Sequence, residues 1–353
     1  MTGLFNKRRA LRPGSYVPEE QEQRDSLDDE SRLPPDGQLN QYLFEHAETE
    51  LNQVFFDSGA HGLYNRHVHV VGGVHGRDLT PRQKELKYAY YSSKEFYAYC
   101  DAYAAFLKDP RCQGAIQFYA TVDVIFNPEL SWKVLKYLED EHGLHPVPVI
   151  HYGTPLKWIA KHLEAKYDLI GLGGLGQEVK KEEYLAWGDQ VFDLICDQPS
   201  RKPMVRTHGF AMTAWSLMRR YPWWSVDSAS WVKLAGYGRI YVPHYRAGQF
   251  VVTENPYMLM VSDETNFEDY SGVHLYRRTE KEQQIVRDWL MEIGVPLGYR
   301  KDDKIVVKGV VNDWTMRAKA NLLLFERFRK ALPEWPWPFK SRPKIATLGL
   351  ASS

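Results

Sequence analysis

Short apolar segments alternate with longer helical patterns through the middle of the chain, and this alternation limits the possible folds more than any other feature. The helical stretches run to roughly 10–20 residues, enough for a crossover between parallel strands. The predicted strands are 54–56, 115–123, 147–152, 167–172, 204–206 and 223–226, and 239–242 and 249–253 are predicted to add a later strand or a hairpin. Six such units within about 200 residues favour an α/β fold of the closed (β/α)8 TIM-type barrel class over a doubly wound sheet.

Composition divides the chain into three parts. Residues 1–40 have a basic start and an acidic, Gln-rich continuation with few apolar residues, so we predict a polar, partly disordered tail. Residues 41–270 hold the strand–helix units and are predicted to form the barrel and its catalytic site. Residues 271–353 are predicted to be a helical, basic extension packed on the barrel. Its segment 300–344 carries twelve Lys and Arg against five Asp and Glu, which is typical of a solvated helix face or of a phosphate-contacting surface.

The overall composition excludes several classes of protein. Lys and Arg number 45, as do Asp and Glu, so any nucleic-acid surface must be local. No apolar run approaches the length of a membrane span and no apolar leader is present at the N-terminus, so a cytoplasmic protein without a membrane partner is expected. Cys100, Cys112 and Cys196 lie far apart, which argues for a reducing compartment and against a cysteine-rich zinc site.

Three carboxylates end three separate predicted strands. They are Asp57, Asp123 and Asp227. Because active sites of parallel α/β folds lie at the carboxyl ends of the strands, these side chains are expected to converge on one pocket. Such a group can supply one carboxylate as a nucleophile and another for proton transfer. A helix cap or a loop ion pair is the structural alternative for each Asp alone.

Other polar or small residues end the remaining predicted strands. His151, Tyr152 and His208 end two of them, and the Gly173-Gly174 pair ends another. The glycine-rich run has neither the dinucleotide fingerprint nor a P-loop, so it is expected to let a flat ligand approach the backbone rather than to bind a cofactor. The histidines of the segment His61 to His75 match no standard metal-site spacing, and we predict no metal and no cofactor.

These residues resemble a known family. Asp57-Ser58-Gly59, Asp123, Gly173-Gly174-Leu175 and Asp227 occur in the order and strand-end contexts of the tRNA-guanine transglycosylase superfamily. The segment His208-Gly209-Phe210 and the run 220–228 resemble its DNA-acting branch, the DpdA-type transglycosylases, which insert 7-deazaguanines into bacterial and phage DNA. The resemblance covers roughly residues 53 to 245.

The resemblance implies a role for each of these positions. Asp227 would be the nucleophile that attacks C1′ of a target deoxyguanosine, and Asp57 the general acid and base. Asp123 would read the N–H edge of the purine, and Gly173, Gly174 and Leu175 would supply backbone against the base. The rest of the implied substrate site is Ser58, Gly59, His151, Tyr152 and His208.

The implied partners are double-stranded DNA, with the target guanine extruded from the stack, and a 7-deazaguanine base such as preQ0. The implied setting is the cytoplasm of a bacterium or of a phage-infected host, and a homodimer is one option for the assembly. No cofactor is required.

The chain departs from the tRNA enzymes in two places. Tyr152, beside His151, stands where those enzymes have a Gln. The Cys-rich zinc subdomain that helps them hold RNA has no counterpart, because the three cysteines are not suitably spaced. We therefore predict a DNA-guanine transglycosylase. The alternatives are the same exchange on tRNA, a non-catalytic barrel that binds nucleic acid, and a hydrolytic glycosidase.

Overall fold

The computed structural model describes residues 54–68, 80–110, 112, 116–174, 181–197, 200–264 and 274–332. The predicted tail and Leu175 lie outside these ranges. The chain divides into two compact units, and each is described by itself below. The first runs to Ile195 and includes Val205–His208; the second consists of Cys196–Met204 and the chain from Gly209 onward.

The first unit is built on parallel strands, as predicted. β1 (Val54–Phe56) pairs with β2 (Ile116–Tyr119), and β3 (Val149–His151) pairs with β4 (Leu169–Gly173), both in parallel. A parallel bridge from Ala120 to Val147 joins the end of β2 to the segment before β3. On the other side of β4 lies β5 (Arg206–Gly209). The strands therefore follow one another in space in their order along the chain, which is typical of repeated strand–helix units.

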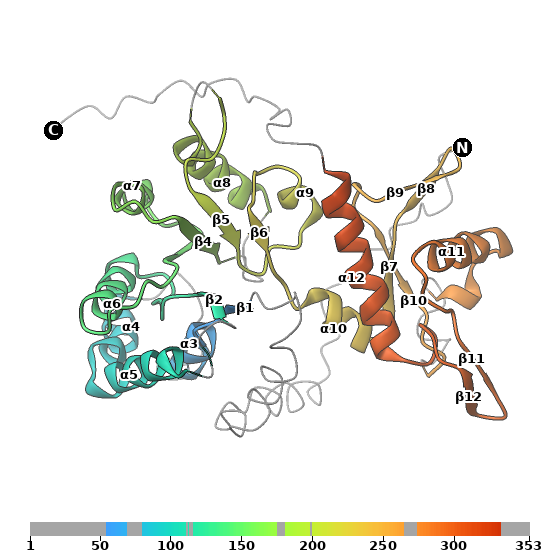
Figure 1. Cartoon of the computed structure of the whole chain (residues 1–353), viewed down its shortest axis with the longest axis horizontal. Helices are drawn as coiled ribbons and strands as arrows, with labels where there is room; N and C mark the ends of the chain where they lie inside the picture. The colour runs from blue at the N-terminus through green and yellow to red at the C-terminus, as the bar shows by residue number, and fades with distance from the viewer. Residues whose placement is uncertain are drawn as a thin grey trace. The chain divides into compact units, whose positions relative to one another are not determined.

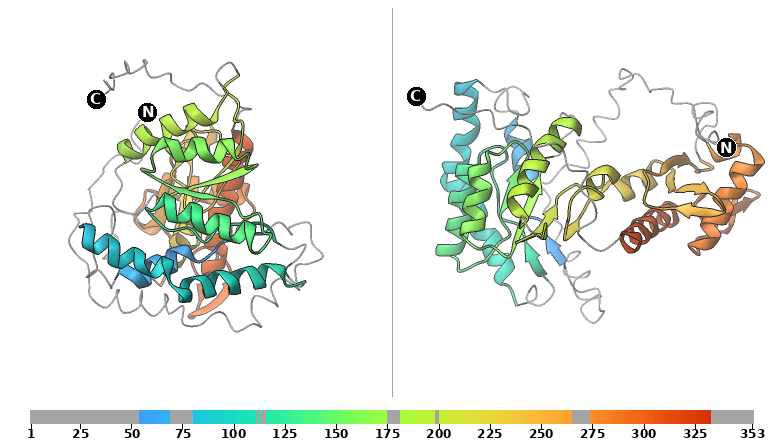
Figure 2. Two further views of the ribbon diagram at one scale, coloured as in Figure 1. Left: turned by 90° about the vertical axis from the view of Figure 1, so that its left-hand side faces the viewer. Right: turned by 90° about the horizontal axis from the view of Figure 1, so that it is seen from above.

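Helices connect these strands and form a layer on their outer side, which is visible in Figure 1 and in both views of Figure 2. They are α3 (Ala60–Val68), α4 (Pro81–Ala89), α5 (Lys94–Lys108), α6 (Pro128–Asp140), α7 (Leu156–Glu164) and α8 (Lys181–Ile195), with a 3-10 turn at Tyr90–Ser92. Local sequence sets their starts. Thr80 forms a capping box with Gln83 before α4, and the Asn127 side chain caps α6, whose first residue is proline. Phe96 and Cys100 of α5 share a core cluster with Val134 and Leu138 of α6.

The parallel sheet of the first unit is strongly curved. The ring of Phe55 on β1 stacks on the ring of His208 on β5, with centroids 4.4 Å apart. The order of the strands places three others between β1 and β5, so a flat sheet would separate these two strands by about 19 Å. The contact is possible only if the sheet curls until side chains from its ends meet across the concave face. This curvature is what a barrel requires, although the described strands of this unit do not by themselves amount to a closed eight-stranded barrel.

The second unit combines helices with antiparallel pairs. It begins with α9 (Trp215–Met218), β6 (Ser225–Val226) and α10 (Ser230–Gly236). β7 (Arg239–Val242) pairs antiparallel with β10 (Tyr257–Met260), and β8 (His244–Arg246) forms a hairpin with β9 (Gln249–Val251). The segments predicted as a later strand or a hairpin therefore belong to antiparallel pairs.

The C-terminal part of this unit consists of a 3-10 turn (Leu275–Arg277), α11 (Glu280–Glu292), the hairpin of β11 (Tyr299–Lys301) and β12 (Lys304–Val307), and α12 (Trp314–Ala331). Figure 1 shows α12 alongside β7. Ile240 and Leu259 share one core cluster with Trp289, Leu324 and Phe328. Elements on both sides of residue 270 thus build a single core, and the compact units divide near β5 rather than at the predicted boundary of 270.

No helix in the described ranges combines the length and the apolar character needed to cross a membrane. The architecture that the described residues establish is a mixed α/β fold with parallel sheet segments.

Candidate active site

Asp57 and Asp123 leave the sheet of the first unit at the same edge. Asp57 follows β1 directly, and Asp123 lies just beyond β2. The amide of Ala120, at the end of β2, donates to the carbonyl of Phe56 over 2.9 Å, so the two strands are still paired where they end. The Asp57 side chain is exposed, whereas Asp123 is only 4% exposed. Both carboxylates therefore follow strands that are neighbours in the sheet, although β2 ends at Tyr119 and not, as predicted, at Asp123.

The turn after β1 is tightly held. The amide of Ser58 donates to Asp57 Oδ1 over 2.7 Å, and the Tyr99 hydroxyl donates to the Ser58 carbonyl, also over 2.7 Å. Gly59 adopts φ +71, and a Cβ added there would lie 2.7 Å from the Tyr99 hydroxyl. Glycine is therefore required both by the backbone conformation and by the space available. The turn fixes the direction in which Asp57 leaves the sheet and starts α3 at Ala60.

Asp123 is paired with the histidine that ends β3. His151 Nε2 lies 2.5 Å from Asp123 Oδ2, and both side chains are largely buried. The edge of Phe126 packs against the imidazole, with ring centroids 6.1 Å apart. Sequence analysis placed both residues at strand ends, and the structure brings them into direct contact.

Buried tyrosines respond to these carboxylates. The Tyr103 hydroxyl of α5 donates to the carbonyl of Ala120 over 2.7 Å. Burial raises the pKa of Tyr103 well above its ordinary value, and the negative charges of Asp57 and Asp123 contribute to the rise. Burial likewise raises the pKa of Tyr91, with Asp123 as the next cause. The rise in the pKa of one buried phenol therefore has a contribution from each of the two carboxylates.

The glycine pair ends β4 against the end of β3. His151 is in register with Gly173, and the amide of Tyr152 donates to the Gly173 carbonyl over 2.9 Å. Gly174 adopts φ +87, and a Cβ there would come within 2.9 Å of the Tyr152 amide nitrogen. The close approach predicted for these glycines therefore occurs, but the neighbour is the chain itself. Leu175 lies outside the described residues.

Tyr152 and His208 were predicted to bind substrate, and in the structure the rings of both are packed against other aromatic side chains. The Tyr152 ring is buried against Tyr184 and Trp187 of α8, with centroids 5.5 and 5.6 Å away. The Tyr152 side chain therefore belongs to the core. The His208 ring is 4% exposed and stacks on Phe55 inside the curved sheet.

Asp227 belongs to the second unit and follows β6 directly. Its side chain is exposed, and the Ala211 amide donates to its Oδ1 over 2.7 Å. Its backbone is held by two more bonds, from its own amide to the Gly209 carbonyl at 3.1 Å and from the Met212 amide to its carbonyl at 2.8 Å. Ala211 adopts φ +54, an uncommon conformation for alanine that aims the amide at the carboxylate. The shared pocket of Asp227 and Asp57 remains a prediction.

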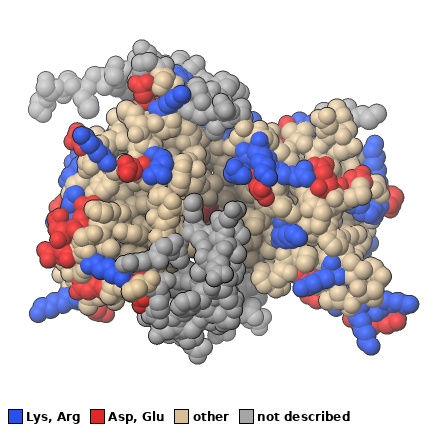
Figure 3. Space-filling view, viewed as in Figure 1, with Lys and Arg blue, Asp and Glu red and all other residues tan. Residues whose placement is uncertain are grey.

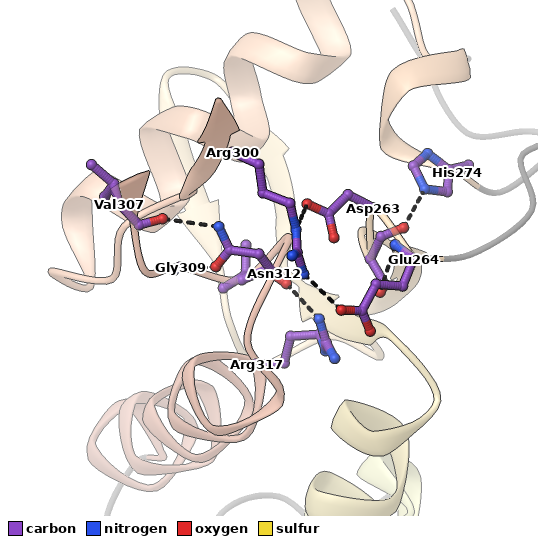
Figure 4. A network of polar contacts seen from close by, with 10 residues as sticks. Asp263, Glu264, His274, Arg300, Val307, Gly309, Asn312 and Arg317 are labelled. Carbon is purple, nitrogen blue, oxygen red and sulfur yellow. Dashed lines mark hydrogen bonds and ion pairs between the residues drawn. The ribbon is translucent and has the colours of Figure 1, made fainter. Parts of the chain in front are cut away.

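Ion pairs neutralise part of the predicted basic surface. Figure 4 shows Arg300 of β11 between Asp263 and Glu264, with Nε–Oδ2 and Nη2–Oε1 distances of 3.0 and 2.6 Å. Lys308 pairs with Asp313 at 2.9 Å. Further ion pairs join Arg327 to Glu292 and Lys330 to Glu326. On the face in Figure 3, basic and acidic side chains are interspersed. Simple charge counting therefore overstates the field available to a phosphate backbone.

Two features were not anticipated from the sequence. The first is the set of tyrosines packed beside the strand-end carboxylates, and their clustering between residues 88 and 103 was a visible signal. The second is Lys87 of α4, which is fully buried. Lysine is almost never fully buried, so nothing in the sequence of this helix marked Lys87 for the interior.

Within the described part of the chain, no group of three or more His, Cys, Asp or Glu side chains is arranged to hold a metal ion. Of the histidines between 61 and 75, only the His61 side chain falls in the described residues, and it is exposed. Comparisons of this chain with protein-family models, curated proteins and solved structures find no match.

Proposed function

We propose that this protein is a DNA-guanine transglycosylase that exchanges guanine in DNA for a 7-deazaguanine base such as preQ0, on a (β/α)8 barrel. The observation that carries the proposal is the pair of carboxylates, Asp57 and Asp123, at adjacent parallel strand ends, where one buried phenol experiences both charges. One of them is exposed, as a group that exchanges protons must be. The other is buried and paired, which suits a group that recognises a base by hydrogen bonds.

The proposed reaction is a two-step displacement at C1′ of an extruded deoxyguanosine. Asp227 attacks C1′ and the bond from C1′ to the guanine nitrogen breaks, while the leaving guanine takes a proton from Asp57. The incoming deazaguanine then gives its proton to the Asp57 carboxylate and attacks C1′. The ester bond to Asp227 breaks and the nucleophile is regenerated. Atoms and charges balance without an oxidant or a metal.

Base recognition is assigned to Asp123. Guanine and its 7-deaza analogues present an N1–H and an amino group on one edge, and both are donors to a carboxylate. Adenine has an acceptor at N1, so it offers the acceptor oxygens of Asp123 no donor at that position. The amide that holds Asp227 Oδ1 orients the nucleophile before DNA arrives.

The direct experiment incubates the purified chain with labelled guanine and either duplex DNA or tRNA. We expect label in DNA, no exchange by Asp227→Asn, and at least about 10²–10³-fold slower exchange by Asp57→Asn. Asp168→Asn is the matched control, because this exposed carboxylate precedes β4 and so lies at the opposite end of a strand. Denaturing gels should show a DNA adduct that requires Asp227.

Several results would contradict the proposal. Label in tRNA alone would assign the same chemistry to RNA. Guanine release without incorporation would indicate a glycosidase. Retention of DNA without exchange, unaffected by Asp227→Asn, would indicate a non-catalytic binding protein.

A further inference from the structure

The contact between Asp123 and His151 is unusual for its burial. The two side chains are 6% and 12% exposed, and their oxygen and nitrogen lie 2.5 Å apart. A carboxylate in such a place is costly unless it is hydrogen-bonded, and the imidazole satisfies one of its oxygens. No side chain in the described ranges donates to the other oxygen, Oδ1. The arrangement therefore leaves one acceptor of a buried carboxylate available to a ligand.

The backbone on both sides fixes the imidazole. His151 ends β3 in register with Gly173, and Gly174 packs directly against Tyr152, the residue after His151. Among the described residues, His151 Nδ1 is buried with no hydrogen-bond partner. His151 also lines a small cavity, together with Asn127, Thr154 and His162. The ring therefore has one strong contact, through Nε2, and that contact is with Asp123.

We propose that His151 is a positioning and specificity-determining residue: it donates from Nε2 to Asp123 Oδ2 and turns Oδ1 toward the donor edge of a guanine-type base. This assignment rests on the proposed function, since it concerns the same base pocket. Removal of the donor leaves Oδ2 of a buried carboxylate without this hydrogen bond and lets the carboxylate rotate, so that Oδ1 no longer faces the donor edge of the base.

The neighbouring Tyr103 does not supply this contact. Its hydroxyl donates to the carbonyl of Ala120 over 2.7 Å, whereas His151 Nε2 lies 2.5 Å from Asp123 Oδ2. The positioning of Asp123 is therefore assigned to His151.

The test compares His151→Leu, which removes the donor, with His151→Gln, which keeps an N–H near the position of Nε2. Binding of free guanine and preQ0 is measured by calorimetry at pH 7, without nucleic acid. We expect His151→Leu to weaken base binding by about 10- to 100-fold, with the KM for DNA little changed. His151→Gln should stay within about threefold of wild type.

A double-mutant cycle separates positioning from general damage. If His151 acts through Asp123, then Asp123→Asn with His151→Leu should bind guanine no more weakly than Asp123→Asn alone. Additive losses, or wild-type binding by a folded His151→Leu protein, would overturn the inference and leave the exchange reaction intact. Base binding by wild type without exchange into any nucleic acid would refute the proposed function, and the His151 variants would still test the binding role. A wild-type protein that binds neither base would refute both.

Discussion

Replacement of Lys87 by methionine is expected to stabilise the protein. Lys87 is 0% exposed, and its Nζ lies 3.7 Å from the centroid of the Tyr64 ring. Within the described residues this amine has no hydrogen-bond partner. Burial lowers the pKa of Lys87 from its ordinary value of 10.5 to about 8. The ring face offsets part of the cost of a buried cation, but not all of it.

The size and the sign of the expected change in the free energy of unfolding follow from proton linkage. The unfolded chain holds the Lys87 proton up to about pH 10 and the folded chain only to about pH 8, so between these values the unfolded state binds more protons. Stability through this group therefore rises with pH across that window. The loss of folding stability caused by burying the Lys87 amine is about 3 kcal/mol at pH 7 and falls to about 1 kcal/mol at pH 9.5. Methionine has similar length and no charge, so Lys87→Met removes the penalty.

Urea unfolding at pH 7 and pH 9.5, followed by tryptophan fluorescence, measures the difference between the variant and wild type. We expect a gain of about 2–3 kcal/mol at pH 7 that shrinks to about 1 kcal/mol at pH 9.5. Lys84→Met on the exposed face of the same helix is the control and should change stability by less than about 0.5 kcal/mol. A loss of stability, or a gain that does not depend on pH, would show that the Lys87 amine is solvated or paired in solution.

Two further substitutions test the packing around the strand ends and the second core. Gly174→Ala should lower the melting temperature and weaken guanine binding, because its Cβ would lie 2.9 Å from the Tyr152 amide nitrogen at φ +87. Gly143→Ala shares a positive φ but has open space, so it should cost only about 1–2 kcal/mol and leave binding unchanged; equal effects of the two would refute the steric argument. Asn321→Leu should destabilise the protein by about 2–4 kcal/mol in urea unfolding. The buried Asn321 amide accepts from the Tyr241 amide at 2.7 Å and donates to the Trp231 carbonyl at 2.9 Å. Lys319→Ala, on the exposed side of α12, is its control, and a stable Asn321→Leu protein would show that these bonds contribute little.

The sequence by itself determined the local structure and the placement of residues along it. Apolar runs bounded by turn residues predicted β1 to β4 and β6, whereas β5 spans 206–209 and not the predicted 204–206. Caps such as Thr80 and Asn127 set where helices begin. Because side chains at the ends of parallel strands share one edge, the neighbouring positions of Asp57 and Asp123 could also be predicted. These features depend on interactions over a few residues or on a strand's periodicity, which the sequence carries directly.

Only the tertiary structure decided which side chains meet and which are buried. The sequence placed Tyr152 and His151 together at the end of β3. In the structure the Tyr152 ring packs against α8, whereas the His151 ring pairs with Asp123. It gave no sign that the Lys87 amine is buried or that β7 pairs antiparallel with β10. Each of these outcomes depends on the packing of segments far apart in the chain. The free energy of burying a charge or of pairing two strands depends on the side chains and backbone groups that those distant segments place around it.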